Sequence, residues 1–421
     1  MLKKIISVAL AVVMAAAFAG CSKTPVNEPE AQDDAAGVAY INKPGQAVPL
    51  SMNVTDKSVF ENAVYNPMMT TANKAFTLRM LNAEADDWTG VYSPLSLQLA
   101  LEILANGGNE ETSAKLLDAV CPGLTREDVN ASSAKLLSML MKTEGFTVNN
   151  AIVVNNAYQL CDEFAKTGAN YYRASVGALD FTDPQAALDE LNGWIEQNTN
   201  GLVKELIDHV GLDTAIVILN ALTLELKWAT PFTAMRELDE FKGLKGVESV
   251  GMIQKTEQLE FGKFEEGEMT LLPYAGGEYC MAVILPAEGV TPKEAVSALI
   301  GRTGECKEMG VFIKMPKVEL NSKLNILEQA KDLGLEEALG GCYSKLISDD
   351  SVSITKVLQG ASLSVTESGT IAAAATAVIG TKGASIARAD VEMICDRPYA
   401  MVIYHIETGT VLFVSIVNDV A

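Results

Sequence analysis

Residues 361–388 read ASLSVTESGTIAAAATAVIGTKGASIAR, a stretch that does not fit an ordinary compact domain. From Ala361 to Thr366 apolar and polar side chains alternate, which predicts a strand with one buried face. The strand runs directly into a long segment of small, mostly uncharged residues. A loop of this length is unusual inside a compact domain and is usually functional. A flexible linker and a helix of small residues are the alternatives.

The segment that follows Glu367 suits a change between an exposed loop and a buried strand. Gly369 supplies backbone freedom at the point where such a loop would hinge. No charged side chain occurs from Gly369 to Thr381, so burial would leave no ion without a partner. The small residues that could enter a crowded sheet without a clash are Ala372, Ala373, Ala374 and Ala375. We therefore expect a segment that is exposed in one state and inserted as a strand in another.

Outward from this segment, the chain mixes helices and strands. Asp183-Pro184 is a helix start, and Asn200-Gly201 ends the apolar periodicity that follows it. A second helix is predicted from about Leu324 to Leu333, ending at Gly334.

Strands are equally clear. Ala215–Trp228 has an apolar face throughout and a second face that becomes polar from Thr223 onward, which predicts a long strand buried on both sides at one end only. Further strands are expected at 279–285 and 311–315, and a closing hairpin at 399–417 turns at Glu407–Thr410. Sequential hairpins after early helices favour an α+β fold.

The N-terminus has the form of an export signal. Two lysines precede a short apolar run, and small residues lead to Cys21. This pattern resembles the lipobox of bacterial lipoproteins, which implies a signal at 1–20 and lipidation of Cys21; an ordinary cleaved signal is the alternative. Residues 21–53 would form a flexible acidic tether, and 54–421 one domain. The expected location is the bacterial envelope, on its periplasmic or outer surface, or the extracellular medium.

Composition excludes several functions. The 421 residues carry 32 Lys and Arg against 54 Asp and Glu, a net charge of −22, which argues against nucleic acid and against electrostatic docking on anionic lipid. The chain has two histidines, no Cys-x-x-Cys pair and none of the common nucleotide, zinc-protease or hydrolase motifs. We expect no enzyme, no metal and no cofactor. The six cysteines after Cys21 could pair or remain free.

The segment after Val365 resembles the hinge of the serpins: Glu, any residue, Gly, Thr, any residue, a run of Ala, then Thr. The matching residues are Glu367, Gly369, Thr370, Ala372 to Ala375 and Thr376. Other serpin-like motifs follow in the family's order: Tyr92-Ser93-Pro94-Leu95-Ser96, Asn192-Gly193-Trp194-Ile195, Asn220-Ala221 with Trp228, Leu272-Pro273-Tyr274, Met315-Pro316-Lys317-Val318 and Arg397-Pro398-Tyr399. Each motif is weak alone, but together they are specific and cover about residues 54–421.

This resemblance implies three β-sheets, eight or nine helices and a reactive loop at about 367–397. A serine endopeptidase, or a cysteine endopeptidase as a further class, would cut the loop and be trapped as the loop enters the central sheet. The resemblance places Ser93, Ser96 and Asn220 where the central strands part, and Trp228 at their upper opening with Glu367 beside it. Gln359 stands where the family commonly has His, which would preserve hydrogen bonds but not pH sensitivity.

The position of the cut is open. Family spacing from Gly369 puts Gly383 before the cut and Ala384 after it, whereas a cut one residue earlier falls at Lys382–Gly383; the loop is long enough for a cut after Arg388. Lys382 would suit a trypsin-like pocket, and Gly383 or Ala384 an elastase-like or subtilisin-like one. We favour Lys382–Gly383 and a monomeric inhibitor. A non-inhibitory binding or carrier protein of the same fold is the alternative.

Overall fold

The computed structural model describes residues 39–50, 57–199, 201, 203, 205–349, 354–370 and 389–420. The chain divides into two units, Met1–Ala39 and Tyr40–Ala421, and the architecture below is that of the second. The described part contains helices α1 (Lys57–Asn62), α2 (Met68–Ala83), α3 (Pro94–Gly107), α4 (Glu110–Val120), α5 (Arg126–Leu140), α6 (Asp162–Tyr172), α7 (Pro184–Asn198), α8 (Pro292–Leu299), α9 (Ile326–Gln329) and α10 (Glu336–Leu339), and the short 3₁₀ helix η1 (Thr303–Glu305).

The described strands form two continuous sheets. The nine-stranded sheet has the order β1 (Gly90–Tyr92), β16 (Thr410–Val417), β15 (Tyr399–His405), β9 (Tyr279–Pro286), β8 (Gly267–Pro273), β7 (Val247–Lys263), β10 (Lys307–Pro316), β14 (Val391–Ile394), with β6 (Thr233–Lys242) also paired to β7. The seven-stranded sheet has the order β3 (Ser175–Leu179), β2 (Phe146–Asn155), β4 (Ile216–Leu224), β12 (Lys356–Val365), β13 (Gly369–Thr370), β5 (Leu226–Lys227), with β11 (Val318–Asn325) also paired to β12.

The α+β class is confirmed, and the described part holds ten α-helices where eight or nine were expected. Three expected sheets appear as two because β7 is 17 residues long. Along most of its length β7 pairs with β10, and its last four residues pair with β8. One strand therefore joins two sets of strands into a single hydrogen-bonded path.

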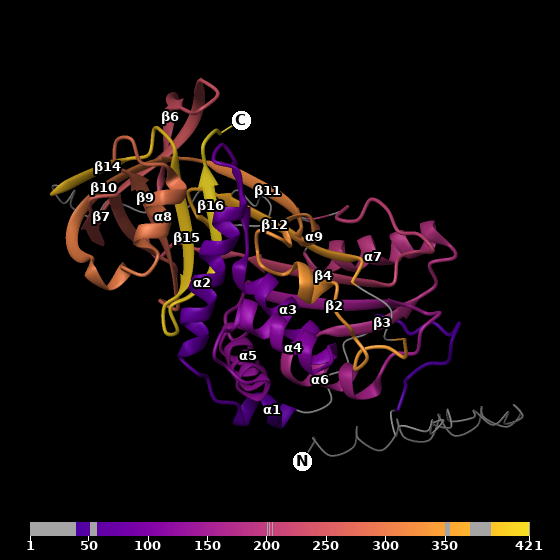
Figure 1. Cartoon of the computed structure of the whole chain (residues 1–421). Coiled ribbons are helices and arrows are strands. Elements are labelled where there is room, and N and C mark those ends of the chain that lie inside the picture. The colour runs from indigo at the N-terminus through magenta and orange to yellow at the C-terminus, as the bar shows by residue number, and fades with distance from the viewer. Residues whose placement is uncertain are drawn as a thin grey trace, which may run out of the picture. The chain divides into compact units, whose positions relative to one another are not determined.

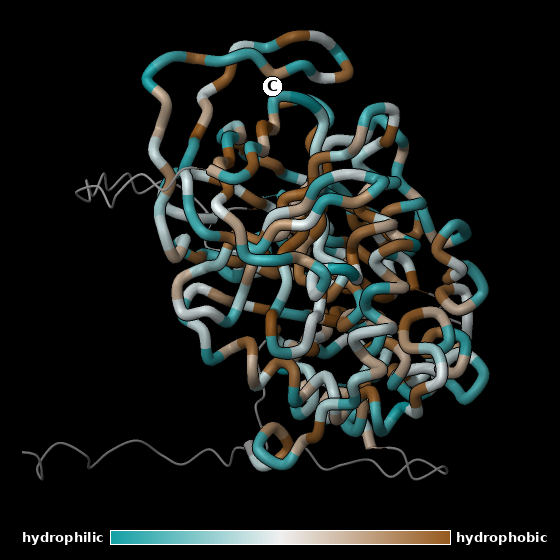
Figure 2. Tube along the Cα trace, turned by 90° about the vertical axis from the view of Figure 1, so that its left-hand side faces the viewer, coloured by the Kyte–Doolittle hydropathy of each residue, from teal (hydrophilic) through white to brown (hydrophobic). Residues whose placement is uncertain are grey.

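The seven-stranded sheet separates two layers of helices. Figure 1 shows β2, β3 and β4 running between α7 on one side and α3, α4 and α6 on the other. Side chains of β4 alternate accordingly: Ile218 belongs to the main core, whereas Val217 and Leu219 pack in a second cluster with α7. In Figure 2 the apolar, brown stretches lie mostly in the interior of this domain. This double burial confirms the two apolar faces expected in Ala215–Trp228, but not one continuous strand, because the stretch forms β4 (Ile216–Leu224) and β5 (Leu226–Lys227). Thr223, expected on a half-exposed face, is buried and hydrogen-bonded to Thr147 (2.5 Å).

Local sequence signals account for α7 but not for the helix expected at 324–333. Asp183 caps α7 by accepting a hydrogen bond from the main-chain nitrogen of Ala186 (3.2 Å), with Pro184 in the first turn. The second helix is shorter than predicted, since Leu324 and Asn325 belong to β11, and α9 covers only Ile326–Gln329. Pairing of Leu324 with Gln359 in the sheet outweighs the helical periodicity.

The closing hairpin is present as predicted. β15 and β16 pair in antiparallel register, and Gly409 in the turn has φ 67°, a left-handed conformation that favours glycine. The strands expected at 279–285 and 311–315 are β9 and β10.

Residues 40–50, which the sequence assigned to the tether, contact the domain. Val48 forms an antiparallel bridge with Ala178 on the edge strand β3, and Tyr40 forms one with Cys161. The buried amide of Asn42 accepts a hydrogen bond from the main-chain nitrogen of Leu160 (2.7 Å). The ordered domain thus begins earlier than residue 54.

All six cysteines after Cys21 lie in the described part, and none of them forms a disulfide there. Burial raises the thiol pKa of Cys161 and Cys306 to about 11 and of Cys280 to about 12. These thiols are therefore protonated and unreactive at neutral pH. Within the described residues, no helix is both long and apolar enough to cross a bilayer.

Candidate functional site

The seven-stranded sheet contains a strand of only two residues, Gly369–Thr370, which we call the hinge strand. It lies between β12 and β5: Thr370 faces Val365 on one side and Leu226 on the other, both in antiparallel register. Thr370 is 1% exposed. The beginning of the segment that the sequence singled out is therefore already part of the sheet.

The three residues before it, Thr366–Ser368, form the hinge turn. The main-chain nitrogen of Thr366 donates to the carbonyl of Gly369 (2.9 Å), which closes the turn. Three donors from outside reach the main-chain carbonyls of the turn, and all come from residues 228–232: Trp228 N to Ser368 O (3.0 Å), Phe232 N to Glu367 O (2.8 Å) and Trp228 Nε1 to Thr366 O (3.0 Å). The hinge turn is thus fixed by hydrogen bonds to its main-chain carbonyls.

Aromatic rings line the inner side of the hinge strand. The ring of Trp228 stacks on that of Tyr274, with centroids 4.6 Å apart and planes within 9°. The Tyr274 hydroxyl lies 2.5 Å from Thr370 Oγ1. Burial raises the pKa of Tyr274 far above its usual range, so its hydroxyl keeps its proton and remains available for this hydrogen bond. Trp228 and Thr370, both chosen from sequence, are thereby joined through a tyrosine that sequence reasoning had not selected.

Glu367 lies in the hinge turn, beside the point where the hinge strand separates β12 from β5. The sequence had placed it next to this opening of the sheet. Its carboxylate forms an ion pair with Lys317 (3.1 Å), and both side chains are partly exposed, at 35% and 45%. Exposed pairs of this kind contribute little stability. The hydrogen bond to the Glu367 carbonyl therefore holds the turn more firmly than its side chain does.

Below the hinge strand the sheet is closed. β12 pairs directly with β4 in parallel register from Lys356–Val217 to Gly360–Ala221, with Gln359 opposite Asn220. Val365 on β12 and Leu226 on β5, which flank Thr370, are 139 positions apart in the chain. Gln359 on β12 and Asn220 on β4, which pair directly with each other, are also 139 positions apart. The open and closed parts of the sheet therefore share one register.

The side chains predicted at the parting of the central strands meet here. The amide of Gln359 makes two hydrogen bonds with the main chain of Ser93, accepting from N (3.0 Å) and donating to O (2.8 Å). Ser93 caps α3 by accepting from the nitrogen of Ser96 and donates to Leu412 O (2.6 Å). Asn220 Nδ2 donates to Ser96 O (2.7 Å). Glutamine thus makes the bonds that tie the sheet to the helix below.

This network is incomplete. Asn220 Nδ2 also donates to Asn150 Oδ1 (2.6 Å), so a second asparagine joins it from β2. Three buried polar atoms at this point have no hydrogen-bond partner among the described residues: Ser96 Oγ, Asn150 Nδ2 and Asn220 Oδ1. Buried polar groups without partners are uncommon and call for an explanation.

Several expected site residues lie outside the described residues. These are Ala372 to Thr376, the candidate bonds at Lys382, Gly383 and Ala384, and the lipidation site Cys21. The chain resumes at residue 389 and enters β14, where the nitrogen of Asp390 donates to Gly310 O (2.6 Å).

Sequence reasoning missed Asn150, Lys317 and the role of Tyr274. Tyr274 and Lys317 lie inside motifs noted above, but no motif indicates which residue they contact. Asn150 sits in an ordinary strand and carries no recognisable signal.

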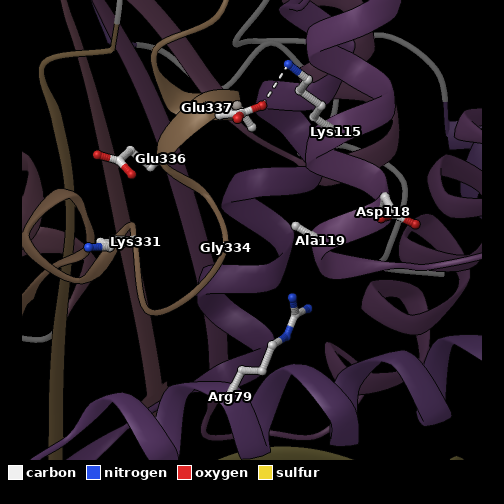
Figure 3. A pocket seen from close by; sticks show the side chains of 9 residues that line it. Arg79, Lys115, Asp118, Ala119, Lys331, Gly334, Glu336 and Glu337 are labelled. Atoms are coloured by element: carbon white, nitrogen blue, oxygen red, sulfur yellow. Dashed lines mark ion pairs between the residues drawn. The ribbon is translucent and has the colours of Figure 1, made fainter.

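Two hollows among the described residues lie away from the hinge strand. One of about 370 Å³ lies between α2, α4 and residues 331–338. Figure 3 shows Arg79 pointing into it and Lys115 paired with Glu337 (3.0 Å) at its rim. Its lining contains no hydroxyl, thiol or imidazole group, and the described residues contain no cluster of His, Cys, Asp and Glu able to hold a metal.

Known proteins share this architecture. The family model described as Serpin (serine protease inhibitor) matches residues 71–420. An uncharacterized serpin-like protein of Thermococcus kodakarensis is 27% identical over 377 residues, which cover 86% of this chain and 88% of that protein. Plasminogen activator inhibitor 1 of Sus scrofa is 25% identical over 364 residues, covering 81% and 89%.

Solved structures agree on the fold. Native tengpin, a thermophilic serpin, superposes with a TM-score of 0.75 at 23% identity, over 88% of this chain and 97% of tengpin. Thyroxine-binding globulin in complex with thyroxine gives 0.72 at 20% identity, over 84% and 99%. Because the family model covers most of the sequence, this chain belongs to the serpin family.

Proposed function

We propose that this protein is a suicide-substrate inhibitor of serine endopeptidases, and not itself an enzyme. Membership of the family supports an inhibitor of proteases in general terms. The observation that carries the specific mechanism is the hinge strand, which occupies the sheet in a register shared with the closed strands below it.

Insertion would extend a strand that has already started. The β4–β12 ladder from Lys356 to Gly360 must open, and one parallel ladder is replaced by two antiparallel ones. Each inserted residue adds hydrogen bonds that the intact protein lacks. The intact form is therefore held by a kinetic barrier and not by equilibrium stability.

The shared register predicts where each loop residue would go. Six residues beyond Thr370, Thr376 would lie between Asn220 and Gln359, and on the same face of the sheet as Thr370. Ser96 Oγ, on helix α3, and Asn220 Oδ1, on β4, are both without a partner among the described residues and lie on that side of the sheet. The Thr376 hydroxyl can both donate and accept, so insertion would satisfy polar atoms that the intact protein leaves unbonded. Ala372 to Ala375 would fill the crowded positions between.

Trapping depends on the timing of insertion. The protease nucleophile attacks the carbonyl before the cut, the new amino terminus leaves, and the acyl-enzyme remains attached to the loop. Insertion of the loop then carries the protease away and distorts it before water can release it. We propose Lys382–Gly383 as the bond and a trypsin-like target; a cut at Gly383–Ala384 would favour elastase-like or subtilisin-like enzymes.

The location and state of the protein complete the proposal. A lipid on Cys21 would tether a monomeric inhibitor to the bacterial envelope, and loss of palmitate labelling in Cys21→Ala would support it. Labelling that persists in that variant would contradict it.

The test of function is direct. The domain, from Tyr40, is mixed with trypsin, elastase and subtilisin, and the products are run on denaturing gels and weighed by intact mass spectrometry. A complex that survives denaturation supports inhibition, and the released C-terminal peptide identifies the bond. Cleavage by all three without a complex or a gain in stability would favour a non-inhibitory binding protein.

A further inference from the structure

An ion pair between a buried lysine and a partly buried glutamate contacts the loop that holds the hinge turn. Lys255 on β7 is 8% exposed, and its ammonium lies 2.7 Å from Glu257 Oε2. A lysine this well buried is rare unless paired. Burial lowers its pKa and the Glu257 carboxylate opposes that effect, so the pair depends on both partners.

The pair fixes residues 228–232, which we call the bracing loop. Lys255 Nζ donates to the carbonyl of Thr230 (3.1 Å), and Thr230 Oγ1 donates to Glu257 Oε1 (2.6 Å). The ammonium also lies 4.6 Å from the centre of the Phe232 ring, within cation–π range. Main chain, hydroxyl and ring of one short loop are thus held by two side chains of β7.

The bracing loop supplies the three outside donors that reach the main-chain carbonyls of the hinge turn. Phe232 N and Trp228 N donate to the turn, and the Trp228 indole adds the third bond. Phe232 and Trp228 also contact each other edge to face, with centroids 5.7 Å apart. A displacement of Thr230 or Phe232 would therefore move the donors on which the hinge turn depends.

We propose that Lys255 and Glu257 are positioning residues that set the pivot of the reactive loop by fixing the bracing loop. This inference rests on the proposed function, because a pivot matters only if the loop moves. Among the described residues, the hydrogen bonds and ring contact of these two side chains go to Thr230 and Phe232 and not to the hinge strand. They act through Thr230 and Phe232.

Hydrogen–deuterium exchange of the intact protein tests this without any protease. In Lys255→Met, which keeps the length of the side chain, amides of residues 364–370 are expected to exchange at least tenfold faster than in the wild type. Lys255→Met alone leaves the Glu257 carboxylate without its partner. The double variant Lys255→Met/Glu257→Gln also removes that carboxylate charge, so it separates loss of the contacts to the bracing loop from the effect of an unpaired carboxylate. It should show the same acceleration.

Lys314→Met is the matched control. Lys314 lies on the neighbouring strand β10 and pairs with Asp239 (2.7 Å). Because Ile313 is the residue opposite Lys255, the side chain of Lys314 points to the other face of the sheet. It should leave exchange at 364–370 unchanged, and circular dichroism should show all variants folded. Unchanged exchange in both Lys255 variants, or equal acceleration in Lys314→Met, would overturn the inference.

A second readout separates this inference from the proposed function. If the wild type traps a protease, Lys255→Met should raise the number of inhibitor molecules consumed per protease at least threefold, and Lys314→Met should not. If the wild type traps none, the proposed function fails, but the exchange result still decides whether Lys255 holds the hinge turn.

Discussion

Replacing Gly369 with alanine would test whether the hinge strand occupies the sheet. A Cβ on Gly369 would lie well inside contact distance of the Leu226 carbonyl oxygen and 2.8 Å from Lys227 Cα. Both obstacles are main-chain atoms of β5, which cannot move aside as a flexible side chain could. We expect Gly369→Ala to expel the hinge strand.

The cost can be worked from the contacts that expulsion would break. These are the bonds from Thr366 N to Gly369 O, from Trp228 N to Ser368 O and between Tyr274 and Thr370. At about 1 kcal/mol each, their loss would cost about 3 kcal/mol. A difference of this size shifts the equilibrium between inserted and expelled hinge by roughly 100-fold.

The assay is hydrogen–deuterium exchange of residues 364–370, which reports local opening. Protection should fall by roughly 100-fold in Gly369→Ala. Gly193→Ala is the control, because a Cβ there meets nothing within 4 Å and alanine favours a helix. Equal protection in Gly369→Ala and the wild type would refute the placement of the hinge strand.

Three further predictions concern insertion and stability. Thr370→Arg would force a cation into a site that is 1% exposed, so it should turn inhibitor into substrate; undiminished trapping on denaturing gels would contradict this. Thr376→Val should reduce the gain in stability on loop cleavage by about 1–3 kcal/mol, because the polar atoms near Asn220 would stay unpartnered; an unchanged gain in denaturant unfolding would count against the projected register. Burial raises the pKa of Glu102, which accepts hydrogen bonds from Gln98, Cys121 and Ser133, to about 7. Its folded pKa exceeds the unfolded value, so the protein should lose about 3 kcal/mol as pH rises from about 4.5 to 7 and little above. Glu102→Gln should flatten this dependence in melting curves at pH 5 and 8, and a slope like that of the wild type would exclude the assignment.

The sequence predicted the fold where local chemistry and tertiary structure agree. The cap at Asp183, the closing hairpin and the two apolar faces of β4 are properties of short stretches, and all are present. The helix expected from Leu324 failed because pairing of Leu324 with Gln359, 35 positions away, decided the local structure. Periodicity cannot reveal such a partner.

The site was predicted in part for the same reason. Ser93, Asn220, Trp228 and Gln359 were found through motifs. The structure places Trp228 at the hinge turn and the other three where β4 and β12 pair below it. The contacts between them pass through residues without a signal of their own. Asn150 is one polar residue in a strand, and Lys255 looks like any lysine on a partly exposed sheet until its burial is known.

The most direct test of loop insertion is the melting temperature of the protein before and after cleavage within the reactive loop. Cleavage by any protease that cuts between residues 378 and 389 suffices, so the natural target need not be known. Insertion in the shared register predicts a rise of tens of degrees, because the cut loop completes a sheet that the intact protein leaves unfinished. An unchanged melting temperature after complete cleavage would contradict insertion, and with it the proposed mechanism of inhibition.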